Sequence, residues 1–184
     1  MPERKTEKRF STATLEVITG CMFSGKSDEL ARRLRIERIA KKKTQLFKPN
    51  HDSNNRINSH SGSEYVAELV DILQPESILE KVNKDTDIVA VDDVHFFGVE
   101  IKDVCKELVN RGKRVIVAGL DMDSQKEVYN STALLMAEAD EVKKLSAVCM
   151  VCGEDANYTK KLAKGSATDK KDYEARCRTC HKVL

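Results

Sequence analysis

Eight consecutive residues carry the clearest chemical signal in this sequence. Gly20 to Ser27 read Gly-Cys-Met-Phe-Ser-Gly-Lys-Ser, which matches the pattern G-x-x-x-x-G-K-S of a phosphate-binding P-loop. The glycines let the backbone curl so that successive N–H groups point at phosphate oxygens. Lys26 would place its charge on the β- and γ-phosphates, and Ser27 would offer a hydroxyl to Mg²⁺. An apolar run, Leu15 to Thr19, precedes the loop and a helical pattern, Asp28 to Lys43, follows it. We therefore predict a nucleoside-triphosphate site rather than a simple glycine-containing turn.

Two adjacent carboxylates follow a second apolar run. Ile88 to Val91 is apolar and β-branched, and Asp92 and Asp93 come directly after it. In P-loop proteins a strand of this kind supplies an Asp to the Mg²⁺ shell, so we predict Asp92 as a magnesium ligand and expect its strand beside the P-loop strand. The alternative is that the pair only ends the strand. Asp93 could accept a proton from an incoming hydroxyl or orient a water for hydrolysis, and spacing alone does not choose between these roles.

Four of the six cysteines form two C-x-x-C pairs near the C-terminus. Two tight pairs of thiolates suit a tetrahedral zinc ion with no open coordination position, which predicts a structural site. Two redox pairs are the alternative, but the surrounding sequence lacks a thioredoxin-like βαβ pattern. His181 follows the last cysteine and is a further candidate ligand, although the symmetry of the pairs favours the cysteines. The predicted metal ligands are Cys149, Cys152, Cys177 and Cys180.

Composition limits the classes of protein that the chain can belong to. With 184 residues, 40% of them hydrophobic, the chain can form one α/β domain and a small appendage. A net charge of +2 is too balanced for a dedicated nucleic-acid binder. No apolar run is long enough for a transmembrane helix, and residues 1–14 lack the apolar core of a secretory signal. We expect a flexible tail at 1–14, an ATP-binding domain at 15–148, a zinc-binding domain at 149–184, and a cytoplasmic location.

The alternation of apolar runs and helical patterns predicts an α/β fold with a parallel sheet. The residues Ile101, Val104, Cys105 and Leu108 follow helical spacing, and Gly112 stands where the helix should stop. The polar stretch from Pro49 to Gly62 is expected to be a long loop. The predicted strands are Leu15–Thr19, Thr44–Phe47, Ile88–Val91 and Arg114–Ala118, and two further helices are predicted at Pro75–Val82 and Ser131–Asp140.

Several segments together resemble the zinc-containing P-loop thymidine kinases. The resemblance runs from about Leu15 to the C-terminus. It implies a RecA-like P-loop core with a parallel sheet, plus a small C-terminal zinc ribbon whose loop, the lasso, folds over the nucleoside. It also implies transfer of the γ-phosphoryl group of ATP to thymidine, Mg²⁺ and structural Zn²⁺, and a homotetramer inhibited by dTTP. Deoxyuridine is a second candidate substrate, and no nucleic-acid or membrane partner is implied. The segments are Gly20–Ser27, Phe47–Pro49, Val91–Phe97, Ala118–Asp121 and the two cysteine pairs.

The resemblance also assigns roles to individual positions. Asp93 stands where the family has its catalytic Glu, which accepts the proton of the 5′-hydroxyl, and Asp92 stands at the Mg²⁺-linked Asp. The positions implied for ATP binding are Gly20, Cys21, Met22, Phe23, Ser24, Gly25, Lys26, Ser27, Arg56, Asp92, Asp93, Val94 and His95. The positions implied for the nucleoside pocket are Met22, Phe96, Leu120, Ser124, Tyr129, Thr159 and the lasso residue Tyr173. For Phe96, Leu120 and Tyr129, ordinary core packing is the alternative.

The chain departs from the family pattern in ways that bear on activity. Asp93 is one methylene shorter than Glu, His95 replaces Gln, Ser124 replaces an aromatic residue and Cys21 replaces Pro. The lasso segment 163–172 lacks the apolar-Gly-Gly sequence whose backbone grips the base. Two other functions therefore stay open: a P-loop ATPase or regulatory protein with a nucleic-acid- or protein-binding zinc ribbon, and a low-activity thymidine kinase relative.

Overall fold

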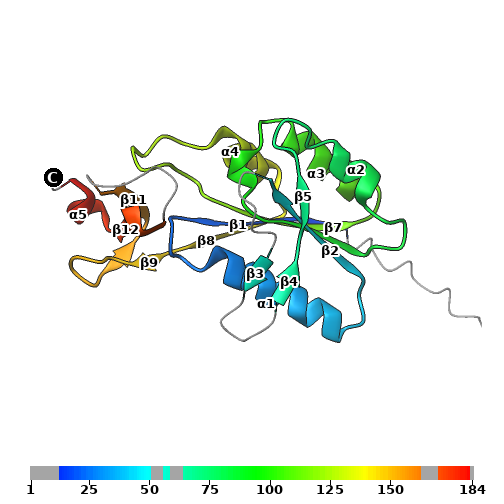
Figure 1. Ribbon diagram of the computed structural model, residues 1–184, viewed down its shortest axis with the longest axis horizontal. Coiled ribbons are helices and arrows are strands. Elements are labelled where there is room, and N and C mark those ends of the chain that lie inside the picture. The colour runs from blue at the N-terminus through cyan, green and yellow to red at the C-terminus, as the bar shows by residue number, and fades with distance from the viewer. Residues whose placement is uncertain (1–12, 51–55, 59–63, 163–169, 183–184) are drawn as a thin grey trace, which may run out of the picture.

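A six-stranded parallel sheet forms the centre of the molecule (Figure 1). The computed structural model describes residues 13–50, 56–58, 64–162 and 170–182, without the side chains at 56–58, 64 and 170. The sheet order is β5-β2-β6-β7-β1-β8, and every pairing in it is parallel. This confirms the predicted α/β class with a parallel sheet and a P-loop core. The strands are β1 (Leu15–Gly20), β2 (Thr44–Pro49), β5 (Glu68–Val70), β6 (Ile88–Val91), β7 (Arg114–Gly119) and β8 (Glu141–Leu145).

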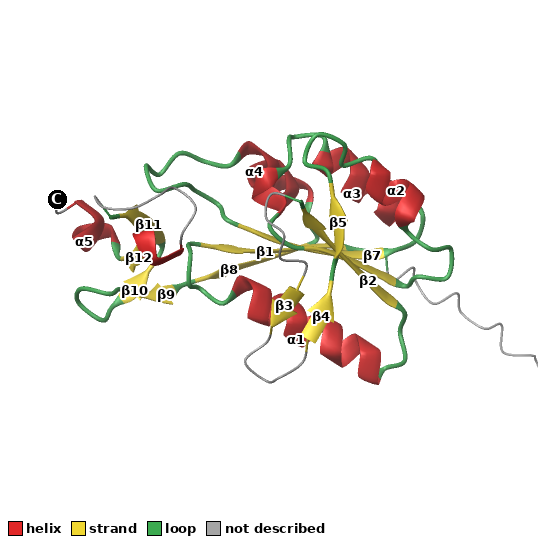
Figure 2. Ribbon diagram, in the orientation of Figure 1, coloured by secondary structure: helices red, strands yellow, loops and turns green. Residues whose placement is uncertain are grey.

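Helices cover both faces of the sheet (Figures 1 and 2). On one face lies α1 (Lys26–Ile39), together with the hairpin of β3 (Arg56–Asn58) and β4 (Glu64–Val66). On the other face lie α2 (Ser77–Lys81), α3 (Ile101–Asn110) and α4 (Asn130–Glu138). A single 3-10 turn, η1 (Val94–Phe96), follows β6. Among the described residues, no helix has both the length and the apolar content needed to cross a membrane.

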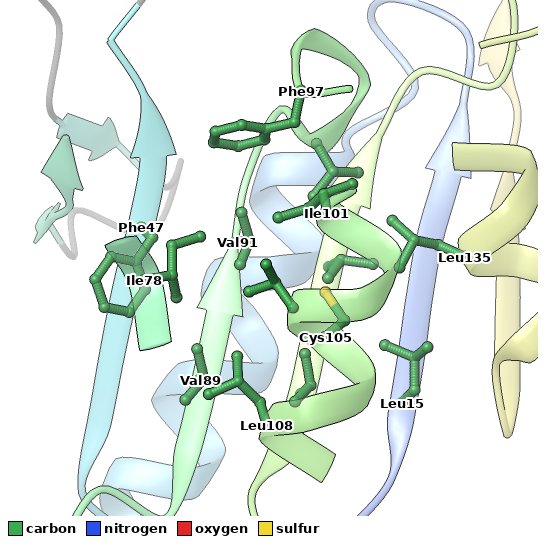
Figure 3. Packing of buried hydrophobic residues seen from close by; sticks show 14 of the residues in the cluster. Leu15, Phe47, Ile78, Val89, Val91, Phe97, Ile101, Cys105, Leu108 and Leu135 are labelled. Carbon is green, nitrogen blue, oxygen red and sulfur yellow. The ribbon is translucent and has the colours of Figure 1, made fainter. Parts of the chain in front are cut away.

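The predicted helical stripe on α3 packs onto the sheet (Figure 3). Ile101, Cys105 and Leu108 are completely buried against β-strand residues such as Val89 and Val91. Burying each Leu or Ile contributes about 1.5–3 kcal/mol relative to leaving it exposed. Burial raises the pKa of the Cys105 thiol to about 12, so this cysteine behaves as an apolar core residue. Helix α1 forms the equivalent cluster on the other face through Leu30, Ala31 and Leu34.

A small module follows β8 and lies at one end of the molecule (Figure 2). Its short strands pair in two antiparallel hairpins, β9 with β10 and β11 with β12. The elements are β9 (Ala147–Val148), β10 (Asp155–Ala156), β11 (Tyr158–Lys161), η2 (Lys170–Asp172), β12 (Tyr173–Arg176) and α5 (Arg178–Lys182). The predicted domain boundaries remain a prediction, and residues 1–12 of the expected tail and 163–169 of the lasso lie outside the described residues.

The expected position of the Asp92 strand is wrong. Strand β7 lies between β6 and the P-loop strand β1, and its residue Val117 pairs with Val17 on one side and Val91 on the other. The apolar runs predict buried strands, but their order depends on how the crossover helices pack, which a run of apolar residues does not encode.

Helix α1 also ends earlier than the sequence pattern predicts, at Ile39 rather than Lys43. Lys41 adopts a left-handed conformation with φ 59°. The amide of Lys42 then donates to the carbonyl of Glu37, and the amide of Lys41 donates to that of Arg38. This is a Schellman ending with a lysine in the position that glycine usually occupies. The segment expected as one loop, 49–62, contains the short strand β3.

Candidate nucleotide-binding and metal sites

The P-loop joins β1 to α1 at the carboxyl edge of the sheet, and its first glycine is required by its surroundings. Gly20 has φ +144°, and a Cβ there would lie 2.3 Å from the carbonyl oxygen of Leu145 on the neighbouring strand. Gly25 is left-handed with φ +81° and precedes the first turn of α1. Phe23 is also left-handed, with φ 67°. The loop therefore uses positive φ angles at three positions, one of which is not a glycine.

Lys26 lies within the curl of the P-loop. Its Nζ donates to the carbonyl oxygen of Cys21 at 2.7 Å. Burial lowers the pKa of Lys26, and the carboxylates of Asp92, Asp93 and Asp121 oppose that shift. A cation that is already desolvated and held over a loop of backbone amides is suited to bind phosphate oxygens.

Asp92 and Ser27 meet directly although β6, which precedes Asp92, and the P-loop strand β1 are not neighbours in the sheet. The Ser27 hydroxyl donates to Asp92 Oδ2 at 2.9 Å, and the amide of Asp93 donates to Asp92 Oδ1 at 3.0 Å. Asp92 is only 2% exposed. Burial raises the pKa of Asp92 to about 7, and the neighbouring Asp93 carboxylate adds to the rise. A buried carboxylate beside a hydroxyl is a fitting ligand pair for Mg²⁺, whose charge would stabilise the ionised form.

Asp93 lies beside a buried lysine that the sequence reasoning did not assign. Asp93 follows β6 in a left-handed conformation, φ 55° and ψ 37°. Its Oδ2 lies 3.4 Å from Nζ of Lys48 on β2, and the side chain of Lys48 is 9% exposed against 26% for that of Asp93. The sequence did contain a signal for this pair, because Lys48 lies in an otherwise apolar strand segment and lysine is almost never fully buried without a partner. The arrangement holds the Asp93 carboxylate near solvent at the carboxyl edge of the sheet.

Aromatic rings gather next to these carboxylates. The His95 ring lies 4.2 Å from the Phe96 ring and 5.0 Å from the Tyr129 ring, measured between centroids. His95 Nδ1 accepts a hydrogen bond from the Leu120 amide at 3.3 Å. Phe96 is 42% exposed, so core packing does not explain it. The structure thus brings four predicted residues together, with Phe96, Leu120 and Tyr129 all in contact with His95.

The other predicted pocket residues vary in their surroundings. Ser124 is half-buried in the connection between β7 and α4. Tyr173 begins β12, and its phenol adds to the raised pKa of Tyr129, which burial mainly causes. Val94 is completely buried in the core, so only its backbone could face a nucleotide. Arg56 lies in β3, and its side chain is outside the described residues.

The predicted Thr159 contacts the P-loop itself. Its Oγ1 accepts a hydrogen bond from the Met22 amide at 3.0 Å, and Thr159 is 3% exposed. One residue earlier, the Cys21 thiol donates to the carbonyl oxygen of Ala156 at 3.3 Å. The C-terminal module therefore touches two consecutive residues of the phosphate-binding loop.

The four C-terminal cysteines form a cluster with metal-site geometry. Their Sγ atoms all lie within 4.8 Å of one another. At each pair the chain makes a tight turn, with Gly153 at φ +80° and the Cys180 amide donating to Cys177 Sγ at 3.3 Å. Four thiolate donors suit a closed tetrahedral zinc site. His181 instead turns its ring towards the carbonyl of Thr159, at 3.0 Å from Nε2.

A parallel α/β core, a P-loop with a facing acidic pair, and a four-cysteine module define a P-loop nucleotide-binding protein with a candidate metal site. The family model for thymidine kinase matches residues 13–181. The chain therefore belongs to the thymidine kinase family.

A similar fold occurs in the crystal structure of the flagellar accessory protein FlaH from Methanocaldococcus jannaschii. The two share 13% sequence identity with a TM-score of 0.52, over 79% of this chain and 76% of that one. At that identity the likeness describes the fold of the core and nothing about its chemistry.

Proposed function

We propose that this protein transfers the γ-phosphoryl group of ATP to the 5′-hydroxyl of thymidine. The observation that carries the proposal is the match of residues 13–181 to the thymidine kinase family. The acidic pair supports it, because a partly exposed carboxylate, Asp93, adjoins the buried Asp92–Ser27 pair beside the P-loop. Such an arrangement suits a hydroxyl acceptor next to a bound triphosphate.

Each group then has a defined task. The P-loop amides and Lys26 bind the phosphates, while Ser27 and Asp92 would hold the Mg²⁺ that neutralises phosphate charge. Asp93 accepts the proton of the 5′-hydroxyl, whose oxygen bonds to the γ-phosphorus as the bond to the bridging β–γ oxygen breaks. ADP leaves with that oxygen, and thymidine 5′-phosphate forms. Lys48, 3.4 Å from Asp93 Oδ2, pairs with the carboxylate and holds it in position for the incoming hydroxyl.

The aromatic group formed by His95, Phe96 and Tyr129 is proposed to bind the thymine base. Phe96 and Tyr129 flank His95, and Tyr173 would approach from the module that carries the lasso. From the family resemblance we also propose a structural zinc ion on the four cysteines, a homotetramer in the cytoplasm, and inhibition by dTTP. Light scattering of the purified protein tests the oligomeric state, and dTTP titration of the activity tests the inhibition.

The test of the reaction uses the purified protein with ATP, Mg²⁺ and a panel of nucleosides. We expect 5′-monophosphate from thymidine, and from deoxyuridine at a lower rate if the base methyl group contributes to binding. No product from either nucleoside would refute the proposal. Steady ATP hydrolysis without any nucleoside would instead favour an ATPase in which Asp93 orients water.

Asp93→Asn tests the base directly. Asn tolerates the left-handed backbone of this position as well as Asp does, so the fold should be unaffected. We expect turnover to fall by roughly 10²–10⁴-fold, with ADP binding unchanged in calorimetry. Asp103→Asn, a change at an exposed carboxylate on α3, is the matched control. Unchanged turnover in Asp93→Asn would remove this carboxylate from the mechanism.

A further inference from the structure

The C-terminal module holds the P-loop at a point where its backbone is strained. The Met22 amide donates to Thr159 Oγ1 at 3.0 Å, and Phe23, the next residue, has φ 67°. A residue with a side chain in the left-handed region costs roughly 1–2 kcal/mol. Such a conformation persists only where surrounding contacts fix it. Within the described residues, the hydrogen bond from the Met22 amide to Thr159 supports this turn from the side of the C-terminal module.

Thr159 is itself held from its opposite side. The carbonyl of Thr159 can only accept a hydrogen bond, so Nε2 of His181, 3.0 Å away, is the donor. His181 is buried, its ring packs edge-on against Tyr158 at 5.6 Å, and its amide donates to the Cys177 carbonyl. It directly follows Cys180 in the cysteine cluster. A continuous set of contacts therefore runs from the cysteine cluster through His181 and Thr159 to Met22.

A second contact supports the same end of the loop. The Cys21 thiol donates to the Ala156 carbonyl, and Cys21 packs in one buried cluster with Ala147, Cys149 and Ala175. The module and the first half of the P-loop thus share a small core. The Met22 amide, committed to Thr159, is not available to phosphate, so the phosphate-facing amides are those that follow it.

We propose that Thr159 and His181 are positioning residues for phosphate binding, which fix the P-loop turn at Met22 and Phe23 and so link the four-cysteine module to nucleotide affinity. The family resemblance places Thr159 in the nucleoside pocket, whereas this role concerns the nucleotide. It does not depend on which nucleoside the protein phosphorylates.

The test measures Mg-ADP binding by calorimetry without any nucleoside. Thr159→Val keeps the shape of the side chain but removes the acceptor, which leaves the partly buried Met22 amide without its partner. The expected loss of affinity is roughly tenfold. Thr159→Ser retains the hydroxyl and should bind ADP within about threefold of the unmodified protein. His181→Phe keeps a ring beside Tyr158 and removes the donor, and should weaken binding by roughly threefold to tenfold.

Thr44→Val is the matched control. The Thr44 hydroxyl accepts a hydrogen bond from Arg38 in the last turn of α1, at the opposite end of that helix from the P-loop. This substitution should therefore leave ADP affinity unchanged.

Hydrogen exchange of the P-loop amides gives a readout that needs no ligand or activity. In protein without nucleotide, the Met22 amide should exchange at least tenfold faster in Thr159→Val and faster in His181→Phe, and at the unmodified rate in Thr159→Ser. If Thr159→Val does not fold, His181→Phe and Thr159→Ser decide the question by the same exchange measurement.

Two results would overturn the proposal. One is unmodified ADP affinity and unmodified Met22 exchange in Thr159→Val. The other is a rise only in the KM for the nucleoside, which would place Thr159 in the nucleoside pocket alone. If the protein phosphorylates no nucleoside at all, the proposed reaction fails while the exchange and ADP measurements still decide the positioning role.

Discussion

Replacing Asp92 by Asn should stabilise the metal-free protein while abolishing phosphoryl transfer. Asn has the same shape, its Oδ1 can accept the Asp93 amide, and its Nδ2 can donate to the Ser27 hydroxyl, so both contacts of Asp92 survive in altered form. What disappears is a negative charge buried beside the carboxylate of Asp93. The loss of the charge removes the proposed magnesium ligand, so Mg-nucleotide binding should fall together with turnover.

The size of this effect follows from the raised pKa of Asp92. Burial moves that pKa from 3.8 to about 7 in the folded protein. Between these two values the folded protein holds a proton that the unfolded chain has released, so the free energy of unfolding decreases as the pH rises. Three pH units at 1.36 kcal/mol each give at most about 4 kcal/mol of destabilisation above pH 7. The stability advantage of Asp92→Asn should therefore grow from about 2 kcal/mol at pH 5 to about 4 kcal/mol at pH 8.

Urea unfolding at pH 5 and pH 8, with EDTA present, measures this difference. Asp103→Asn serves as the control, because its carboxylate is exposed and its removal should change stability little at either pH. An Asp92→Asn protein whose advantage does not increase with pH, or which is less stable than the unmodified protein at pH 8, would refute the reasoning. Added Mg²⁺ should narrow the gap, because it stabilises the ionised carboxylate of the unmodified protein alone.

Three further predictions follow from the same contacts. Gly20→Ala places a Cβ 2.3 Å from the Leu145 carbonyl oxygen, so it should abolish ADP binding and lower the midpoint of urea unfolding. Gly112→Ala, where the new Cβ meets nothing within 4 Å, should cost only about 1–2 kcal/mol, and an equal loss at both sites would contradict the steric argument. Lys48→Met should lower kcat by roughly tenfold with ADP affinity unchanged, because it removes the cation beside the Asp93 carboxylate; a change in ADP affinity alone would show that Lys48 acts elsewhere. Metal analysis should find about one zinc per chain, and Cys152→Ser should lose it; retention of zinc by that variant would exclude the four-cysteine site.

The sequence predicts helix ends best where a single residue type determines the backbone conformation. Gly112 marks the end of α3 as expected: it is left-handed with φ +80°, and the Lys113 amide donates to the Leu108 carbonyl across it. At the end of α1 the same geometry is adopted by Lys41, a residue that gives no stop signal. The sequence pattern therefore predicts too long a helix, because local backbone hydrogen bonds end it at a residue type that does not signal a stop.

Contacts between distant segments are the part that the sequence did not predict. The pairing of Lys48 with Asp93 and of Thr159 with Met22 joins residues that are 45 and 137 positions apart. Edge strand β8 was also missed, because Glu141–Leu145 is charged and largely exposed and so lacks the apolar run by which the other parallel strands were found. The position of β8 still matters, because the carbonyl oxygen of its Leu145 lies so close to Gly20 that a Cβ at position 20 would clash with it.

The acidic pair illustrates how one backbone conformation separates two chemically identical neighbours. Asp92 directly follows the buried strand β6 and is held by Ser27. The left-handed turn at Asp93, φ 55°, instead places the second carboxylate beside Lys48 and nearer to solvent. Asp adopts this conformation more readily than Glu, since short polar side chains are enriched in the left-handed region. Compared with Glu, Asp thus lowers the energy of the left-handed backbone, but its carboxylate extends less far towards the substrate hydroxyl. An Asp at this position therefore suits the proposed base, because the left-handed turn that points the carboxylate towards solvent favours the shorter residue.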